Sequence, residues 1–273
     1  MDNRVLERII IAILLLLNLS LAAVVLSDRA ETRRSNGEIA AYVLQVLQDN
    51  NITAAEGAVR VQAAPKRVTL ARDEQRESEI VRQLLGRAEP QEQGGKILFY
   101  QTNKGQALFR GSGEVAALYT AGAVPLRAGL AKTTLRLLKR AGIDAELAGP
   151  VSEETMSAEV RCVWNGYPVY NALLRFDYSD ESLYMISGNR VFDSLTEEEG
   201  AGLMNSTSAL LRFVELVKQD GIICSRLDAV RPGYLQTVLV SGESTLSPVW
   251  RIETDTGVFL INAETGVMET GIA

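Results

Sequence analysis

The stretch Ile9–Leu26, IIIAILLLLNLSLAAVVL, decides how the rest of the chain is organised, because it contains no charged residue. Eighteen helical residues span about 27 Å, close to the hydrocarbon thickness of a bilayer. We therefore predict a short tail over residues 1–8 and one transmembrane helix over residues 9–26. A cleaved signal peptide is the alternative, with Ser20-Leu21-Ala22 as its cleavage site. The apolar run continues past that site, which favours an uncleaved anchor.

Asn18 is the most polar residue of this apolar segment. An amide buried in lipid favours hydrogen bonding to a partner helix, and Ala22 follows one turn later on the same face. We predict that Asn18 and Ala22 form a contact between membrane helices; the alternative is that a single Asn is tolerated there without a role. Arginines flank both ends of the segment, so the positive-inside rule does not decide its orientation.

The composition excludes several classes of function. The chain has 273 residues with a net charge of −6, which argues against a nucleic-acid-binding protein. It has no histidine, so Ser-His-Asp and Cys-His catalysis and the commonest zinc ligands are missing. We expect no enzymatic activity, no cofactor and no metal site. Cys162 and Cys224 either form a disulfide in an oxidising compartment or stay as two thiols, and we favour the thiols.

The first half of the region beyond the anchor, residues 27–150, contains helix and hairpin signals. A capping box at Ser35–Glu38 predicts the start of a helix that ends at Asn50-Asn51. Further helices are expected over 73–85 and 126–141, and a hairpin turns at Asn103-Lys104-Gly105. One side of the helix over 126–141 is basic, and it either touches lipid headgroups or is simply solvated. The basic residues are Lys132, Arg136, Lys139 and Arg140.

The second half, residues 151–273, shows stronger strand patterns. Asn165-Gly166 predicts a tight turn within three antiparallel strands over residues 160–187. A second capping box at Thr196 and Glu199 predicts the start of a helix that ends at Gly221, and strands follow over 234–263. Aromatic residues gather in this half and line a glycan or peptide groove or simply pack in the sheet. They are Trp164, Tyr167, Tyr170, Tyr178 and Tyr184.

An internal echo links the two halves. Leu137–Ile143 is similar to Leu216–Ile222, and Val46–Ile52 is a fainter third copy. Each closes a predicted helix that lies between strand-forming segments. We therefore predict an α+β fold in which the transmembrane helix precedes two related lobes, 27–150 and 151–273, each a helix packed on an antiparallel sheet.

Two segments resemble YycI (WalI) regulators. The first, GYPVYN over residues 166–171, is similar to a hairpin of that family; the second, over residues 247–266, is similar to its closing strands. The residues that carry the resemblance are Gly166, Tyr167, Pro168, Asn171, Pro248, Trp250, Asn262, Thr265 and Gly266.

The resemblance implies a single-pass accessory regulator of a cell-wall two-component system, with residues 1–8 as a short cytoplasmic tail and the C-terminal region outside the cytoplasmic membrane. It also implies contact with a sensor histidine kinase and a YycH-type sister protein through the membrane helix. PepSY-type domains end on a similar motif. That similarity implies an alternative, an extracytoplasmic module that inhibits or chaperones a peptidase.

Overall fold

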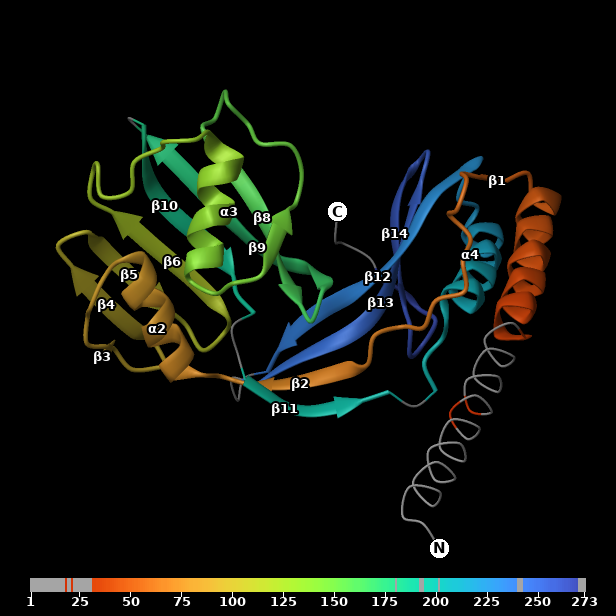
Figure 1. Cartoon of the computed structure of the whole chain (residues 1–273), viewed down its shortest axis with the longest axis horizontal. Coiled ribbons are helices and arrows are strands. Elements are labelled where there is room, and N and C mark those ends of the chain that lie inside the picture. Colours follow the sequence, from red (N-terminus) through yellow and green to blue (C-terminus); the bar gives the residue numbers. More distant parts are fainter. Residues whose placement is uncertain are drawn as a thin grey trace, which may run out of the picture.

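The computed structural model describes residues 18, 21, 31–179, 181–191, 194–200, 202–239 and 243–269. Its strands and helices form two packed groups that meet where the longest strands cross (Figure 1). In the view of Figure 1, one group lies around α2 and α3, and the other lies around α4 and the helical residues 31–49.

The first group buries α2 (Glu74–Leu84) and α3 (Leu130–Arg140) against strands. Helix α2 starts where predicted, because the Asp73 side chain accepts a hydrogen bond from the Arg76 backbone N–H at 2.8 Å and so caps the helix. The strands of this group are β3 (Gln91–Glu92), β4 (Leu98–Thr102), β5 (Gly105–Phe109), β6 (Glu114–Tyr119), β7 (Ala145–Leu147), β8 (Ser157–Trp164), β9 (Tyr167–Ser179) and β10 (Ser182–Asn189).

The second group is built around Trp250, whose side chain is fully buried and donates a hydrogen bond from Nε1 to the Met204 carbonyl at 2.9 Å. Helix α4 (Ser206–Asp220) and the helical residues 31–49 supply apolar side chains to the same core, among them Phe213 and Leu47. The strands are β1 (Thr53–Ala54), β2 (Arg67–Ala71), β11 (Ser194–Glu199), β12 (Arg226–Val238), β13 (Ser244–Thr254), β14 (Gly257–Asn262) and β15 (Met268–Glu269).

The predicted fold class, two related α+β lobes that each pair a helix with its own antiparallel sheet, is wrong. Hydrogen bonds join the fifteen strands of the described residues into one network, with the path β11-β2-β13-β12-β9-β10-β6-β5-β4-β3. Strands from the two halves of the sequence are direct neighbours in it, since β6 pairs with β10, and β2 pairs with both β11 and β13. Two pairs, β1–β12 and β9–β12, are parallel. Alternating hydrophobicity shows which face of a strand is buried but does not show which strand lies beside it.

The internal echo has a local explanation. In all three copies an Ile backbone N–H donates to the carbonyl five residues earlier: Ile52 to Leu47, Ile143 to Leu138 and Ile222 to Val217, at 2.9, 2.9 and 3.0 Å. The residue before each Ile has a positive φ, which completes the Schellman ending of a helix. The echo therefore reports a shared way of ending helices rather than a repeated lobe.

Helix starts were predicted less well than helix ends. Thr196 and Glu199 belong to strand β11, which pairs with β2, so the second capping box is wrong. Helix α4 instead begins after Asn205, whose side chain accepts from the Ser208 N–H at 2.8 Å. Ser35–Glu38 lies inside the helical segment 31–49 and not at its start. At Thr196 and Glu199, pairing of β11 with β2 thus overrode a local capping signal.

Two hairpin predictions are confirmed. Strands β4 and β5 meet at the expected Asn103-Lys104 turn, and β8 and β9 meet at Asn165-Gly166. Asn165 and Gly166 have φ values of 48° and 82°, as a two-residue turn with positive φ at both positions requires.

The prediction of a membrane anchor falls almost wholly outside the structure described. No helix within the described residues combines the length and the apolarity needed to cross a bilayer. Residues 9–26 lie outside the described residues apart from Asn18 and Leu21, which are helical and exposed. Ala22 is also outside them, so the predicted contact between Asn18 and Ala22 stays a prediction.

Candidate functional site

The two groups of strands meet where β9 runs parallel to β12, with Val169 opposite Tyr234. Gly233 permits this close approach. A Cβ atom at this position would lie 2.7 Å from the Pro168 carbonyl oxygen and would collide with the ring of Tyr170. Only glycine fits here without a shift of either strand, so the close approach of β9 and β12 depends on Gly233.

The side chain of Asn171 joins β9 to β12 beside this crossing by hydrogen bonds. Its side-chain amide accepts from the Gln236 N–H at 2.8 Å and donates to the Gln236 carbonyl at 2.8 Å. The side-chain amide therefore forms the two hydrogen bonds that the backbone of a neighbouring strand would otherwise form with Gln236. This motif residue has a structural role, since it holds the two groups of strands together.

A cleft of about 280 Å³ opens beside the crossing, and we call it the tyrosine–arginine cleft. Motif residues Gly166, Tyr167 and Pro168 lie along one side of it. The other side chains that decide its chemistry are Glu146 from β7, Arg161 from β8, Tyr170 from β9, Arg231 from β12 and Arg251 from β13. Strands far apart in the sequence thus bring three guanidinium groups and two phenol rings into one place.

Tyr170 forms the floor of the cleft between two cations. The guanidinium carbons of Arg161 and Arg251 lie 5.3 and 5.6 Å from the centre of its ring, within the range of cation–π attraction. Burial raises the pKa of Tyr170 to about 12, against the opposing effect of the two arginines, so the phenol is neutral at physiological pH. Burial also lowers the pKa of Arg251.

Two carboxylates partly neutralise the cleft. Glu146 lies 3.3 Å from Arg161, and Glu253 pairs with Arg251 and lies 3.9 Å from Arg231. Three guanidinium groups against two carboxylates leave one net positive charge. The Nε–H of Arg161 is buried and has no hydrogen-bond partner among the described residues. The cleft therefore offers aromatic surface, positive charge and a spare donor, which suit an acidic or carbonyl-bearing group of a partner.

The closing part of the motif lies elsewhere. Asn262 accepts hydrogen bonds from the backbone N–H groups of Glu264 and Thr265 at 2.9 and 3.2 Å. Gly266, at a φ of 70°, accepts from Arg212 of α4 at 3.1 Å. Pro248 accepts from the Ala263 N–H at 2.9 Å, and Trp250 is buried below. These residues close the turn between β14 and β15 onto α4, so their role is structural.

The arginines of the cleft were not identified from the sequence. Arg251 lies inside the motif beside Trp250, and Arg161 alternates with buried residues in β8, but neither pattern says that they converge. Of the aromatic group, Tyr167 and Tyr170 line the cleft, whereas Tyr178 is buried in the sheet and Tyr184 is 54% exposed. Two of the five aromatic side chains therefore line a cleft, and a glycan or peptide as its ligand stays a prediction.

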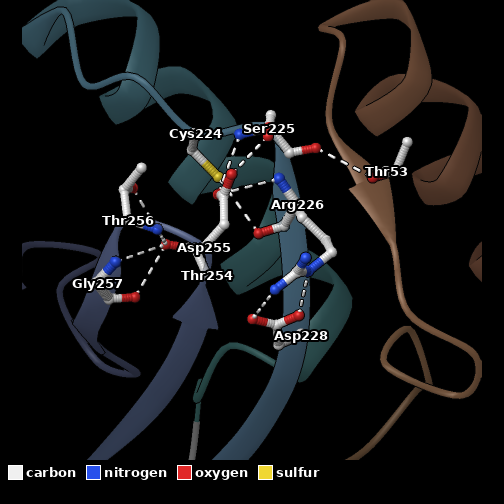
Figure 2. Close-up of polar contacts among 9 residues, drawn as sticks. All are labelled: Thr53, Cys224, Ser225, Arg226, Asp228, Thr254, Asp255, Thr256 and Gly257. Atoms are coloured by element: carbon white, nitrogen blue, oxygen red, sulfur yellow. Dashed lines mark hydrogen bonds and ion pairs between the residues drawn. The ribbon is translucent and has the colours of Figure 1, made fainter.

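A second polar cluster lies at the far end of β12 and β13 (Figure 2). The Asp255 carboxylate accepts from the backbone N–H groups of Ser225 and Arg226, both at 3.1 Å, and from the Ser225 hydroxyl. Thr53 of β1 donates to the Ser225 carbonyl at 3.1 Å and so joins the cluster. These bonds occupy most of the acceptor sites of Asp255 and hold the ends of β1, β12 and β13 together.

Neither cysteine is in a disulfide. Cys162 is buried in β8, and burial raises the pKa of its thiol to about 12. Cys224 is half-buried beside the Asp255 cluster, and its pKa is raised, mainly by burial (Figure 2). Within the described ranges, no three His, Cys, Asp or Glu side chains are grouped to hold a metal ion.

Comparisons with known proteins give distant structural similarity only. No family model matches the chain, and no curated protein matches it. An uncharacterised protein from Eubacterium rectale aligns over 81% of this chain and 90% of its own, at 9% identity and a TM-score of 0.44. YycH from Bacillus subtilis aligns over 79% of this chain and 58% of its own, at 11% identity and a TM-score of 0.34.

Proposed function

We propose that this protein is an accessory regulator of a two-component sensor histidine kinase and acts by protein–protein contact rather than by catalysis. The proposed partners are the kinase and a YycH-type sister protein. The motif residues that resemble YycI regulators support this assignment. The observation that carries the contact is the tyrosine–arginine cleft, because Tyr and Arg are enriched among residues that dominate binding energy at interfaces.

The geometry suits recognition of a partner segment that presents an acidic side chain. Arg231 is 65% exposed and reaches the cleft from β12, whereas Arg161 and Arg251 are 15% and 24% exposed. An incoming carboxylate would pair with Arg231 first and then displace water from the deeper arginines. Each of these charge-assisted bonds is stronger than a neutral hydrogen bond.

A pair of charge reversals tests the contact. Arg231→Glu places a carboxylate at the mouth of the cleft, and Arg175→Glu changes an arginine of β9 that is 53% exposed and lies outside the cleft. In the native host we expect Arg231→Glu to lower recovery of the kinase with the tagged protein by about ten-fold or more. We expect Arg175→Glu to stay within about two-fold of wild type.

Equal recovery with both variants would remove the cleft from the proposal. Recovery of a peptidase in place of the kinase would favour the PepSY-like alternative. Phosphorylation of the response regulator, measured in the same cells, should change with Arg231→Glu and remain at the wild-type level with Arg175→Glu.

We also propose that the folded region beyond the predicted membrane helix, which we call the body, acts on the outer side of the cytoplasmic membrane, as the resemblance implies. Protease added to cells stripped of their wall should then digest the body while cytoplasmic marker proteins survive. Protection of the body until the cells are lysed would contradict this location.

A further inference from the structure

A second hollow, of about 310 Å³, lies beside α3, on a different part of the surface from the tyrosine–arginine cleft. We call it the α3 groove. Helix α3 forms one wall, the turn between β4 and β5 contributes Lys104, and the loop that leads into α3 contributes Arg127. Helix α3 itself contributes Thr133, Arg136 and Arg140.

The charge of the α3 groove is unusual for this chain. The whole chain has a net charge of −6, yet four cations line the groove and no carboxylate among the described residues does. Neither Lys104, Arg127, Arg136 nor Arg140 forms an ion pair within the described part of the chain, although Arg140 donates to the Gln83 carbonyl at 3.0 Å. Four exposed arginines elsewhere are paired, namely Arg82 with Glu79, Arg175 with Asp177, Arg212 with Glu215 and Arg226 with Asp228, whereas Arg60 and Arg87 form no ion pair among the described residues. Four like charges that face one hollow repel one another, and a bound anion relieves that repulsion.

Thr133 supplies an independent observation. Its side chain is only 7% exposed, it lines the groove, and its hydroxyl has no hydrogen-bond partner among the described residues. The carbonyl one turn earlier, that of Gly129, accepts from the Thr133 backbone N–H at 3.1 Å. A buried polar group without a partner is rare in native proteins and calls for an explanation, and a ligand that accepts the hydroxyl proton provides one.

The spacing along α3 places these groups together. Thr133, Arg136 and Arg140 lie three and four residues apart, so they share one face of the helix. Leu137 and Val124 supply apolar surface between them. Apolar walls weaken the screening by water and strengthen attraction between the cations and an anion.

We propose that the α3 groove binds a phosphate group. Arginine presents paired donors that match two phosphate oxygens, the third and fourth cations balance the charge, and the Thr133 hydroxyl donates to a remaining oxygen. The phosphate belongs either to a soluble phosphate compound or to the headgroup of an anionic lipid, and both offer the same oxygens.

Paired double variants test the site in the full-length protein in a mild detergent at low salt. Pyrophosphate and inorganic phosphate are titrated by calorimetry. Arg127→Gln with Arg136→Gln removes two charges from the groove, and Lys132→Gln with Lys139→Gln removes two charges from the same region outside its lining. We expect the first pair to raise the Kd by about ten-fold or more and the second by less than about two-fold. Equal weakening by both pairs, or no binding by the wild type, would overturn the proposal.

Thr133→Val separates the hydroxyl from the charges. Valine has the same shape and removes only the unpartnered group, so we expect the Kd for phosphate to rise by about three-fold or more, with no loss of thermal stability in the absence of phosphate. An unchanged Kd would overturn the role assigned to Thr133.

The source of the phosphate is decided by a third set of probes. Glycerophosphoglycerol is the headgroup of an anionic lipid without its acyl chains, and glycerophosphocholine is its zwitterionic control. Binding of glycerophosphoglycerol comparable to that of phosphate, lost in the Arg127→Gln with Arg136→Gln protein, supports a lipid source. Binding of phosphate and pyrophosphate alone supports a soluble one, and binding of none of the probes overturns the proposal.

Discussion

Glu77 and Asp255 each collect several hydrogen bonds on one carboxylate, but Glu77 is inside the molecule and Asp255 is at its surface. Glu77 is fully buried and accepts from Arg72 at 2.8 and 2.9 Å, and it also pairs with Arg190 at 2.8 Å. Asp255 is exposed and accepts from two backbone N–H groups and one hydroxyl. The chemistry is similar, and access of water is the difference.

The buried cluster links the two groups of strands. Arg72 follows β2, Glu77 lies on α2, and Arg190 follows β10, so three separate segments meet at one carboxylate. The side chains of Arg72 and Arg190 are 8% and 2% exposed. When a buried ion loses its partner, water cannot replace it, whereas a surface group is rehydrated at once. The comparison therefore predicts a large effect inside and a small one outside.

The largest effect is expected for Glu77→Gln. The substitution keeps the shape but puts a neutral amide against two buried guanidinium groups, and it should lower the free energy of unfolding by about 3 kcal/mol or more. Urea denaturation measures this change. Glu79→Gln is the matched control on the same helix, because Glu79 forms an exposed pair with Arg82 at 2.6 Å and should matter little. Similar midpoints for both variants would remove the distinction drawn here.

Asn171→Ala tests the intermediate case, a partly buried neutral contact. It removes both bonds to the backbone of Gln236 and should lower the free energy of unfolding by about 2 kcal/mol. Hydrogen exchange of the Gln236 amide should become faster. Asn189→Ala, at an exposed strand position, is the control and should leave this exchange unchanged. Unaltered protection of Gln236 in Asn171→Ala would argue against the role of Asn171 in joining β9 to β12.

The smallest effect is expected for Asp255, and it depends on pH. The Ser225 hydroxyl and the Arg226 backbone N–H lower its pKa from 3.8 to about 2. Between these two pKa values the unfolded chain binds more protons than the folded protein. The contribution of Asp255 to stability is therefore fully present above about pH 4 and falls as the pH decreases towards 2. Acid unfolding of wild type and Asp255→Asn should show a difference at neutral pH that shrinks below pH 4. A constant difference would exclude Asp255 as the titrating group.

The accuracy of prediction from the sequence follows the range of the interactions. The Asn165-Gly166 turn and the start of α2 at Asp73 are decided by neighbours in the chain, and both were predicted, although the capping role of the Asp73 side chain was not. The capping box at Thr196 and Glu199 failed because β2 pairs with that segment, and Lys66 forms an ion pair with Glu198 at 3.0 Å. The internal echo was real but reported helix ends, so it misled the fold class.

The candidate site was predicted only in part. Tyr167 and Pro168 were singled out by the resemblance of residues 166–171 to a YycI hairpin, and they do line the cleft. Arg161, Arg231 and Arg251 come from three strands whose pairing no local pattern reports. The same limit applies to the α3 groove, where the basic residues of the helix were noted but Lys104 and the unpartnered Thr133 hydroxyl were not.

The amino-acid sequence by itself determined where most helices end, where two hairpins turn and which classes of chemistry lack their residues, because each of these depends on composition or on contacts within about six residues. Only the tertiary structure decided that β6 lies beside β10, that Glu77 meets Arg190, and that three arginines line one cleft with Tyr170. Backbone hydrogen-bonding groups are the same in every strand, so strand partners are selected by the packing of the whole core, and the polar sites follow from that selection.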